Sequence, residues 1–127
     1  MVFQMRDDLL DYTSRKSITG KPIGSGGSLG RTQATGYGVV YTLREALKEL
    51  NLRPEDTTAS VQGFGNVAQY AIELYAQMGG TVTCVSSWDQ ADQISYCFAK
   101  KDGVDLAELR GITDRFGGID KARAADL

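Results

Sequence analysis

The sequence predicts an α/β fold, because a strand, a glycine turn, a helix and a second strand follow one another within residues 57–86. The strands are expected over Thr57–Gln62 and Thr81–Ser86, and Gly63-Phe64-Gly65-Asn66-Val67-Ala68 lies between the first strand and the helix. A connection of this kind forms a right-handed crossover between parallel strands. We therefore predict one βαβ half of a doubly wound parallel sheet, a partial Rossmann-like domain with flanking helices.

The glycine turn has the G-x-G-x-x-A spacing of turns that hold the phosphates of a dinucleotide. Gly63 allows the tight turn, Gly65 lets the backbone approach a pyrophosphate, and Ala68 stands where the helix packs on the strand. The positive amino end of the helix suits a pyrophosphate, and Asn66 is placed to cap that end. The alternative is a glycine-rich connection without a ligand, but the helix and strand that follow favour binding.

The helix after the turn is expected to end at Gly79-Gly80, a common C-terminal signal. Its predicted apolar face consists of Val67, Ala71, Leu74, Tyr75 and Met78.

A second amphipathic helix is expected from Thr35 onward, because apolar residues recur with helical spacing. Gly36 and Gly38 lie in its first turns, where each glycine costs about 1 kcal/mol relative to alanine. We therefore expect a ligand or a tightly packed neighbour beside them. The predicted apolar stripe consists of Val39, Val40, Leu43, Ala46, Leu47 and Leu50.

The C-terminal part predicts a short strand over Ile94–Ala99 and then another helix. Asp105 and Glu108 form a capping box for this helix, which is expected to continue through Phe116 and to end at Gly117-Gly118. Two parallel strands alone do not make a buried sheet, so we expect the domain to be truncated.

Composition excludes several classes of protein. A chain of 127 residues with 42% hydrophobic content can bury one core, and a net charge of −2 argues against a nucleic-acid partner. Neither a long apolar run nor a leader pattern appears, so we expect no membrane partner and a cytoplasmic location. The absence of histidine removes His-dependent catalysis, and no metal site is expected. Cys84 and Cys97 indicate a reducing compartment, with Cys84 as a small buried hydrophobic residue.

The end of the second strand is where NAD-selective sites carry an acidic residue that binds the ribose hydroxyl. Ser87 occupies this position, and Asp89 follows two residues later. Asp89 is either the coenzyme ligand or a solvated loop residue. A preference for NAD is therefore not fixed by these residues, and NADP stays open.

The N-terminal region is expected to contain a helical segment over residues 1–18, followed by a truncated dinucleotide-binding domain over residues 19–127. Residues 19–30 are rich in glycine and serine, which is typical of a flexible linker. Gly24 to Thr32 superficially suggests a triphosphate-binding loop. No glycine precedes Gly30 at the required spacing and Arg31 replaces the lysine, so this class of site is excluded.

Several motifs can be read together: Lys21-Pro22, Gly26-Gly27-Ser28, Gly30-Arg31, Ala34-Thr35-Gly36, Gly38-Val39, Arg44-Glu45-Ala46 and Gln62 to Val67. They include a G-G-S-x-G-R-x-x-A-T-G-x-G-V pattern followed by a strand and G-F-G-N-V. This combination resembles the coenzyme domain of glutamate dehydrogenases, with the match running from about Thr19 to Leu109. The resemblance implies an ordered glycine-serine loop rather than a linker.

The resemblance implies that Thr35 and Asn66 contact the coenzyme and that Gly36 and Gly38 pack near its nicotinamide end. Ala68 and Ser87 depart from the family pattern, which more often has glycine and aspartate there. With the turn itself, the candidate coenzyme-binding residues are Thr35, Gly63, Phe64, Gly65, Asn66, Val67 and Ser87.

The resemblance further implies an oxidoreductase that uses NAD or NADP to deaminate L-glutamate to 2-oxoglutarate and ammonia, and that is homo-oligomeric at full length. The substrate domain with the catalytic lysines and aspartate would precede this chain, so no catalytic residue is predicted here and the chain is expected to be inactive alone. Two alternatives are a noncatalytic nucleotide-binding or assembly module and the coenzyme domain of a leucine, phenylalanine or valine dehydrogenase.

Overall fold

The computed structural model describes residues 28–126. The helical segment predicted over residues 1–18 and most of the glycine-serine loop lie outside the described residues. The chain divides into two units, Met1–Thr35 and Gly36–Leu127, and the second is described below unless the first is named. In chain order the elements are α2 (Arg31–Glu49), the short helix η2 (Pro54–Asp56), β1 (Thr58–Gln62), α3 (Asn66–Gln77), β2 (Thr81–Asp89), β3 (Ile94–Ala99), α4 (Leu106–Gly111) and α5 (Lys121–Ala124).

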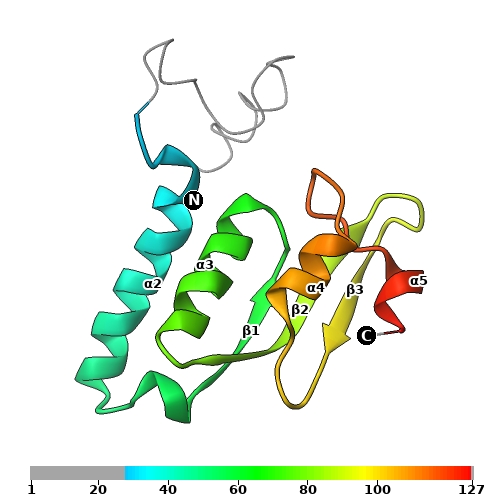
Figure 1. The fold of residues 1–127 in the computed structure, drawn as a ribbon. Coiled ribbons are helices and arrows are strands. Elements are labelled where there is room, and N and C mark those ends of the chain that lie inside the picture. Colours follow the sequence, from blue (N-terminus) through cyan, green and yellow to red (C-terminus); the bar gives the residue numbers. More distant parts are fainter. Residues whose placement is uncertain (1–27, 127) are drawn as a thin grey trace. The chain divides into compact units, whose positions relative to one another are not determined.

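The described strands form one sheet in the order β1-β2-β3 (Figure 1). β1 and β2 are parallel and are joined through α3, which confirms the α/β class and the predicted βαβ half. β3 runs antiparallel to β2, because only residues 90–93 separate the two strands and a parallel connection needs a dozen or more residues. The sheet is therefore mixed at its third strand.

The predicted strand bounds agree with the structure except at the end of β2. β3 has the predicted bounds, Ile94–Ala99, and β1 begins one residue later than expected, at Thr58. β2 continues to Asp89 rather than ending at Ser86, because pairing with β3 extends as far as Asp89 and Ile94.

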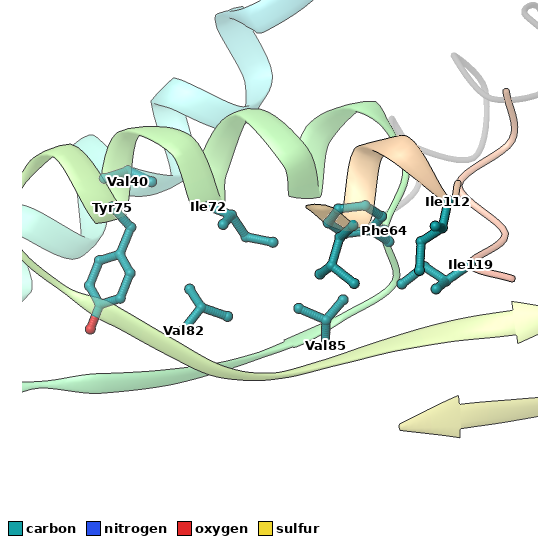
Figure 2. Packing of buried hydrophobic residues seen from close by; sticks show 9 residues of the cluster. Val40, Phe64, Ile72, Tyr75, Val82, Val85, Ile112 and Ile119 are labelled. Atoms are coloured by element: carbon teal, nitrogen blue, oxygen red, sulfur yellow. The ribbon is translucent and has the colours of Figure 1, made fainter. Parts of the chain in front are cut away.

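The core lies between α3 and one face of the sheet (Figure 2). Ile72 and Tyr75 of α3 point toward the sheet, where Val82 and Val85 of β2 face them. Phe64, at the end of β1, is 1% exposed, so its side chain anchors the glycine turn to the core. Burial of a phenylalanine side chain contributes about 1.5–3 kcal/mol. Val40, Leu109, Ile112 and Ile119 complete the cluster.

The apolar face of α3 is wider than predicted. Ile72, which was not expected to be buried, is 2% exposed, whereas Val67 and Ala71 are half-buried. The reason is that α3 contacts the sheet, α2 and α4, so more than one side of the helix is covered.

α2 approaches α3 most closely at Gly36. A Cβ atom at this position would lie 2.6 Å from the Val67 carbonyl oxygen and 2.9 Å from the Ala71 nitrogen. Gly36 is therefore required by a tightly packed neighbour, one of the two explanations expected for it. Gly38 differs, since a Cβ atom there would meet no described atom within 4 Å.

The apolar stripe of α2 is narrower than predicted. Val40 and Leu47 are buried and Leu43 packs against the core, but Val39 and Leu50 are 53% and 67% exposed. In the described part of the chain α2 packs only on one side, so it buries a single line of residues rather than a full face.

The last predicted helix is shorter than expected, because α4 ends at Gly111 and not at Phe116. The Asp105 half of the predicted capping box is confirmed, since the Asp105 carboxylate accepts a hydrogen bond from the Glu108 N–H at 2.9 Å. The Glu108 carboxylate forms an ion pair with Lys100 at 3.7 Å. Beyond α4, the Asp114 carboxylate accepts hydrogen bonds from the backbone of Phe116 and Gly118, which replace helical hydrogen bonds with a turn.

Candidate functional site

The glycine turn connects the end of β1 to the amino end of α3. Gly63 has φ +87°, a conformation that favours glycine, and its N–H donates to the Ser86 Oγ at 3.3 Å. Gly65 is the N-cap of α3, and the helix has no hydrogen bond from a capping side chain. The prediction that Asn66 caps the helix is therefore wrong, because Asn66 is already its first helical residue.

Gly65 has no structural reason of its own to be glycine. Its φ of −74° and ψ of −173° suit any residue, and a Cβ atom would meet no described atom within 4 Å. Serine, threonine, asparagine and aspartate are preferred over glycine at an N-cap, since their side chains satisfy the first N–H groups of the helix. The turn therefore leaves space among the described residues at the positive end of a twelve-residue helix, and its N-cap residue supplies no side chain to the first N–H groups.

Gln69 and Arg110, which were not predicted as site residues, support the glycine turn through hydrogen bonds. The Gln69 side chain donates to the Phe64 carbonyl at 2.9 Å and accepts from the Arg110 guanidinium at 3.1 Å. Arg110 also forms an ion pair with Glu73 at 2.9 Å, so α4 ties the first turns of α3 to the loop. These contacts fix the direction of the turn backbone.

The segment after α4 packs directly on the turn. Gly117 has φ +87°, and a Cβ atom there would lie 2.6 Å from the Phe64 carbonyl oxygen and 2.7 Å from the Gly65 nitrogen. The pair Gly117-Gly118 was interpreted as a helix stop from local sequence alone. Gly117 is instead required by its contact with Phe64 and Gly65, which lie far from it in the chain. No local sequence signal reveals this contact.

The predicted coenzyme-binding residues lie in different surroundings. Gly63, Gly65, Asn66 and Val67 are contiguous at the turn, and Asn66 is exposed. The Phe64 side chain is in the core, so only its backbone lies at the turn surface.

Thr35 belongs to the first unit and lies in α2, and its hydroxyl accepts a hydrogen bond from Arg31 at 3.4 Å. It is the last residue of that unit, and Gly36 is the first residue of the second.

Ser87 lies on the core side of β2. It is 4% exposed, and its Oγ accepts a hydrogen bond from the Ile119 N–H at 2.9 Å. The alternation of side chains along a strand explains this placement, because Ser87 shares a face with the fully buried Val85. Ser86, on the opposite face, is the residue whose hydroxyl contacts the glycine turn.

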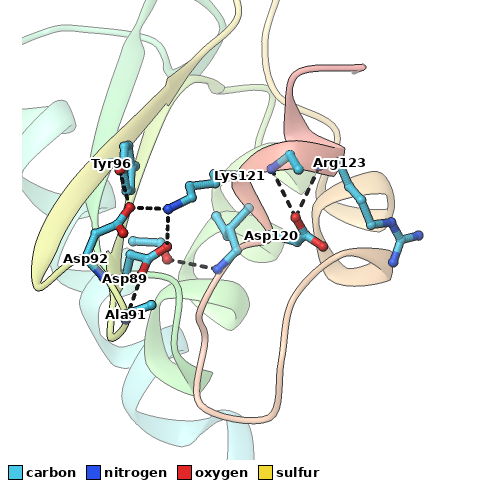
Figure 3. A network of polar contacts seen from close by, with 10 residues as sticks. Asp89, Ala91, Asp92, Tyr96, Asp120, Lys121 and Arg123 are labelled. Atoms are coloured by element: carbon cyan, nitrogen blue, oxygen red, sulfur yellow. Dashed lines mark hydrogen bonds and ion pairs between the residues drawn. The ribbon is translucent and has the colours of Figure 1, made fainter.

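Asp89 is held within a polar network at the hairpin between β2 and β3 (Figure 3). Its carboxylate accepts hydrogen bonds from the backbone of Ala91 and Asp92, both at 2.9 Å, and forms an ion pair with Lys121 at 3.2 Å. The backbone hydrogen bonds, with those of Lys121, lower the pKa of Asp89. Lys121 also pairs with Asp92, which lowers the pKa of that carboxyl and raises the pKa of Lys121.

We expect replacement of Lys121 by methionine to destabilise the hairpin slightly at neutral pH. Each carboxyl with a lowered pKa stabilises the fold fully when the pH is above the ordinary pKa of that carboxyl. This stabilisation is lost as the pH falls through the lowered pKa of the folded state. The lysine contribution is present below its ordinary pKa of 10.5 and is lost only at higher pH. The difference in urea midpoint between parent and variant should therefore shrink as the pH falls from about 6 to about 3. A constant difference over this range would contradict the assignment.

Neither a membrane helix nor a metal centre emerges from residues 28–126. No helix in this range has the length and apolarity needed to cross a bilayer. No three His, Cys, Asp or Glu side chains in the same range are grouped so that they could hold a metal ion.

The parallel βαβ unit and its glycine turn define the chain as an α/β domain of the Rossmann-like class. Residues 26–126 match the family model of the Glutamate/Leucine/Phenylalanine/Valine dehydrogenases. The chain belongs to this family.

Curated relatives agree with this assignment. The NAD-specific glutamate dehydrogenase of Peptoniphilus asaccharolyticus is 39% identical over 93 residues, which are 73% of this chain and 22% of the relative. The NADP-specific glutamate dehydrogenase of Helicobacter pylori strain J99 is 40% identical over 109 residues, 86% of this chain and 23% of the relative. The chain thus spans less than a quarter of the length of either protein.

Solved structures show the same similarity. Glutamate dehydrogenase from Peptoniphilus asaccharolyticus has a TM-score of 0.65 at 39% identity, covering 73% of this chain and 23% of that one. The hetero-hexameric glutamate dehydrogenase from Thermus thermophilus has a TM-score of 0.67 at 27% identity, covering 81% and 23%. Both support the α/β arrangement described above.

Proposed function

We propose that this chain is the coenzyme-binding part of a glutamate dehydrogenase and that it holds the pyrophosphate of NAD or NADP at the turn from Gly63 to Ala68. The observation that carries the proposal is Gly65, a glycine that neither its backbone angles nor its described neighbours require. A phosphate close to the backbone accounts for it, because any side chain there would occupy the space that the phosphate needs.

The contacts around the turn support this function. The N-cap residue Gly65 supplies no capping side chain to α3, and the positive end of the helix there suits a bound pyrophosphate. Gln69 and Gly117 hold the turn backbone in place before a ligand arrives, which reduces the ordering cost of binding. Gly63, Phe64, Gly65, Asn66 and Val67 then form the phosphate site. The family resemblance adds Thr35 as a coenzyme contact, whereas Ser87 departs from the family pattern and is buried.

The names of the relatives support the choice of coenzyme and of substrate. They include NAD-specific, NADP-specific and NAD(P)-specific glutamate dehydrogenases. In such an enzyme the nicotinamide exchanges a hydride with the amino acid. This chain contributes the coenzyme platform and no acid or base for proton transfer, so it does not turn over glutamate by itself. A full-length protein with this domain forms oligomers.

Selectivity between the coenzymes is expected to be weak. Ser87 is buried, so it is not available to a ribose hydroxyl. The Asp89 carboxylate already accepts from two backbone N–H groups and pairs with Lys121, so it is not free to select a ribose hydroxyl either. We therefore expect NADH and NADPH to bind with affinities within roughly tenfold of each other, a difference of about 1.4 kcal/mol.

Fluorescence titration of the whole chain with NADH and with NADPH tests this function. Saturable binding of both reduced coenzymes is expected, and addition of glutamate with either oxidised coenzyme should give no reduction. Absence of binding by a chain that is folded by circular dichroism would reject the proposed site. Glutamate-dependent reduction would instead reject the assignment of a platform without catalytic groups.

A further inference from the structure

The two cysteines of the chain are close together, although they are thirteen positions apart in the sequence. Cys84 of β2 and Cys97 of β3 have their sulfur atoms 3.1 Å apart. Cys84 is half-buried and Cys97 is exposed, so the expectation of a fully buried Cys84 is wrong. The antiparallel pairing of β2 with β3, which the sequence does not specify, brings the thiols together.

The register places both thiols on the sheet face opposite the core. Cys97 is directly opposite Ser86, and Cys84 is directly opposite Ala99, so the two cysteines form a diagonal pair across the strands. Val85, between Cys84 and Ser86 in β2, points into the core, and its neighbours therefore point away from it. A disulfide has a sulfur separation of about 2.05 Å, so the thiols need to approach by about 1 Å. Because a diagonal pair is wide for a disulfide, closing this distance needs a small backbone shift of β3 as well as side-chain rotation.

We propose that Cys84 and Cys97 form a redox-active dithiol that a hydroperoxide oxidises to an intrachain disulfide. The exposed Cys97 thiolate attacks one oxygen of hydrogen peroxide, gives a sulfenic acid and releases the other oxygen as water. The Cys84 sulfur then attacks the sulfenic sulfur, forms the S–S bond and displaces its oxygen as a second water. Overall, two thiols lose two electrons and two protons, and one peroxide is reduced to two waters.

The surroundings of the two sulfur atoms support the attacking role of Cys97 and the resolving role of Cys84. A hydrogen bond with Cys97, together with partial burial, raises the pKa of the Cys84 thiol. This disfavours Cys84 as the attacking sulfur, and the exposed Cys97 is the thiol that peroxide can reach. Cys84 is then the resolving thiol, held within reach of the sulfenic acid by the strand pairing.

The dithiol lies next to the glycine turn. Cys97 is paired with Ser86, and the Ser86 hydroxyl accepts the hydrogen bond from the Gly63 N–H. Formation of the disulfide is expected to move β3 relative to β2 at this level. The oxidation state of the pair is therefore in a position to alter the turn.

Oxidation of the reduced, full chain with equimolar hydrogen peroxide tests the proposal. We expect both thiols to disappear together in maleimide labelling and the intact mass to fall by two hydrogen atoms. Dithiothreitol should restore both. The reaction of the native chain should be roughly tenfold or more faster than that of the urea-unfolded chain, because the fold holds the thiols together.

Cys84→Ser and Cys97→Ser variants, which keep nearly the same size, separate the two roles. Dimedone should capture a sulfenic acid on Cys97 in the Cys84→Ser chain and little or none on Cys84 in the Cys97→Ser chain. Equal capture in the two variants would overturn the assigned roles. In the parent chain, a mass gain of oxygen atoms, disulfide-linked dimers or equal rates in native and unfolded chains would overturn the dithiol itself.

Discussion

Replacement of Gly65 by serine should weaken coenzyme binding while leaving the fold at least as stable. Serine is a better N-cap than glycine, and its hydroxyl would accept from the N–H groups at the start of α3. The same hydroxyl would occupy the space beside Gly65 and would accept hydrogen bonds from N–H groups that the pyrophosphate otherwise uses. Loss of one hydrogen bond to a charged group costs about 1.5–3 kcal/mol, so the affinity for NADH should fall roughly 10- to 100-fold. NADH fluorescence titration gives the affinity, and urea unfolding gives the stability.

Gly111→Ser is the matched control for this experiment. Gly111 ends α4, and a Cβ atom there would also meet no described atom within 4 Å. The control should therefore bind NADH like the parent chain. Undiminished binding by Gly65→Ser, or equal losses in the two variants, would show that the space beside Gly65 is not a phosphate site.

Replacement of Gly36 by alanine is expected to have the largest effect on stability. The added methyl group would lie 2.6 Å from the Val67 carbonyl oxygen and 2.8 Å from the Tyr70 Cβ. These neighbours belong to the backbone and first side-chain carbon of α3, so the two helices must separate to admit it. Overpacking of this kind costs about 1–3 kcal/mol, and we expect a loss near the upper end in urea unfolding followed by circular dichroism.

Gly38→Ala tests the same change two residues later on the same helix. A Cβ atom there has open space among the described residues, and alanine is favoured over glycine in a helix by about 1 kcal/mol. The control should therefore be as stable as the parent chain or more so. If both variants were stabilised, the close packing of α2 on α3 would be rejected.

The elements were predictable where the signal is local. A run of strand-forming residues, a glycine turn and a Gly-Gly stop are enough to define β1 and α3, and the capping box defines the start of α4. The end of α4 was missed because the Asp114 carboxylate competes for backbone N–H groups, and helical periodicity does not record that competition. The exposure of Val39 and Leu50 depends on how many partners α2 has, which periodicity also does not record.

The glycine turn of the candidate site could be predicted from the sequence, but the residues that support the turn could not. The spacing of Gly63 and Gly65 identifies the turn, since the glycines themselves form it. The contacts from Ser86, Gln69 and Gly117 come from other elements, and their residue types are ordinary in their local sequence. Sequence spacing predicted Ser87 at the end of the second strand, but β2 continues to Asp89, and the inward face of the strand buries Ser87.

The most direct test of a phosphate site at the turn is an amide NMR titration of the whole, isotope-labelled chain with NADH. The account predicts saturable shifts centred on the backbone N–H groups of Gly63, Gly65, Asn66, Val67 and Ala68, with the same affinity at each. Shifts that avoid these amides, or no shifts at coenzyme concentrations that saturate the fluorescence signal, would contradict it.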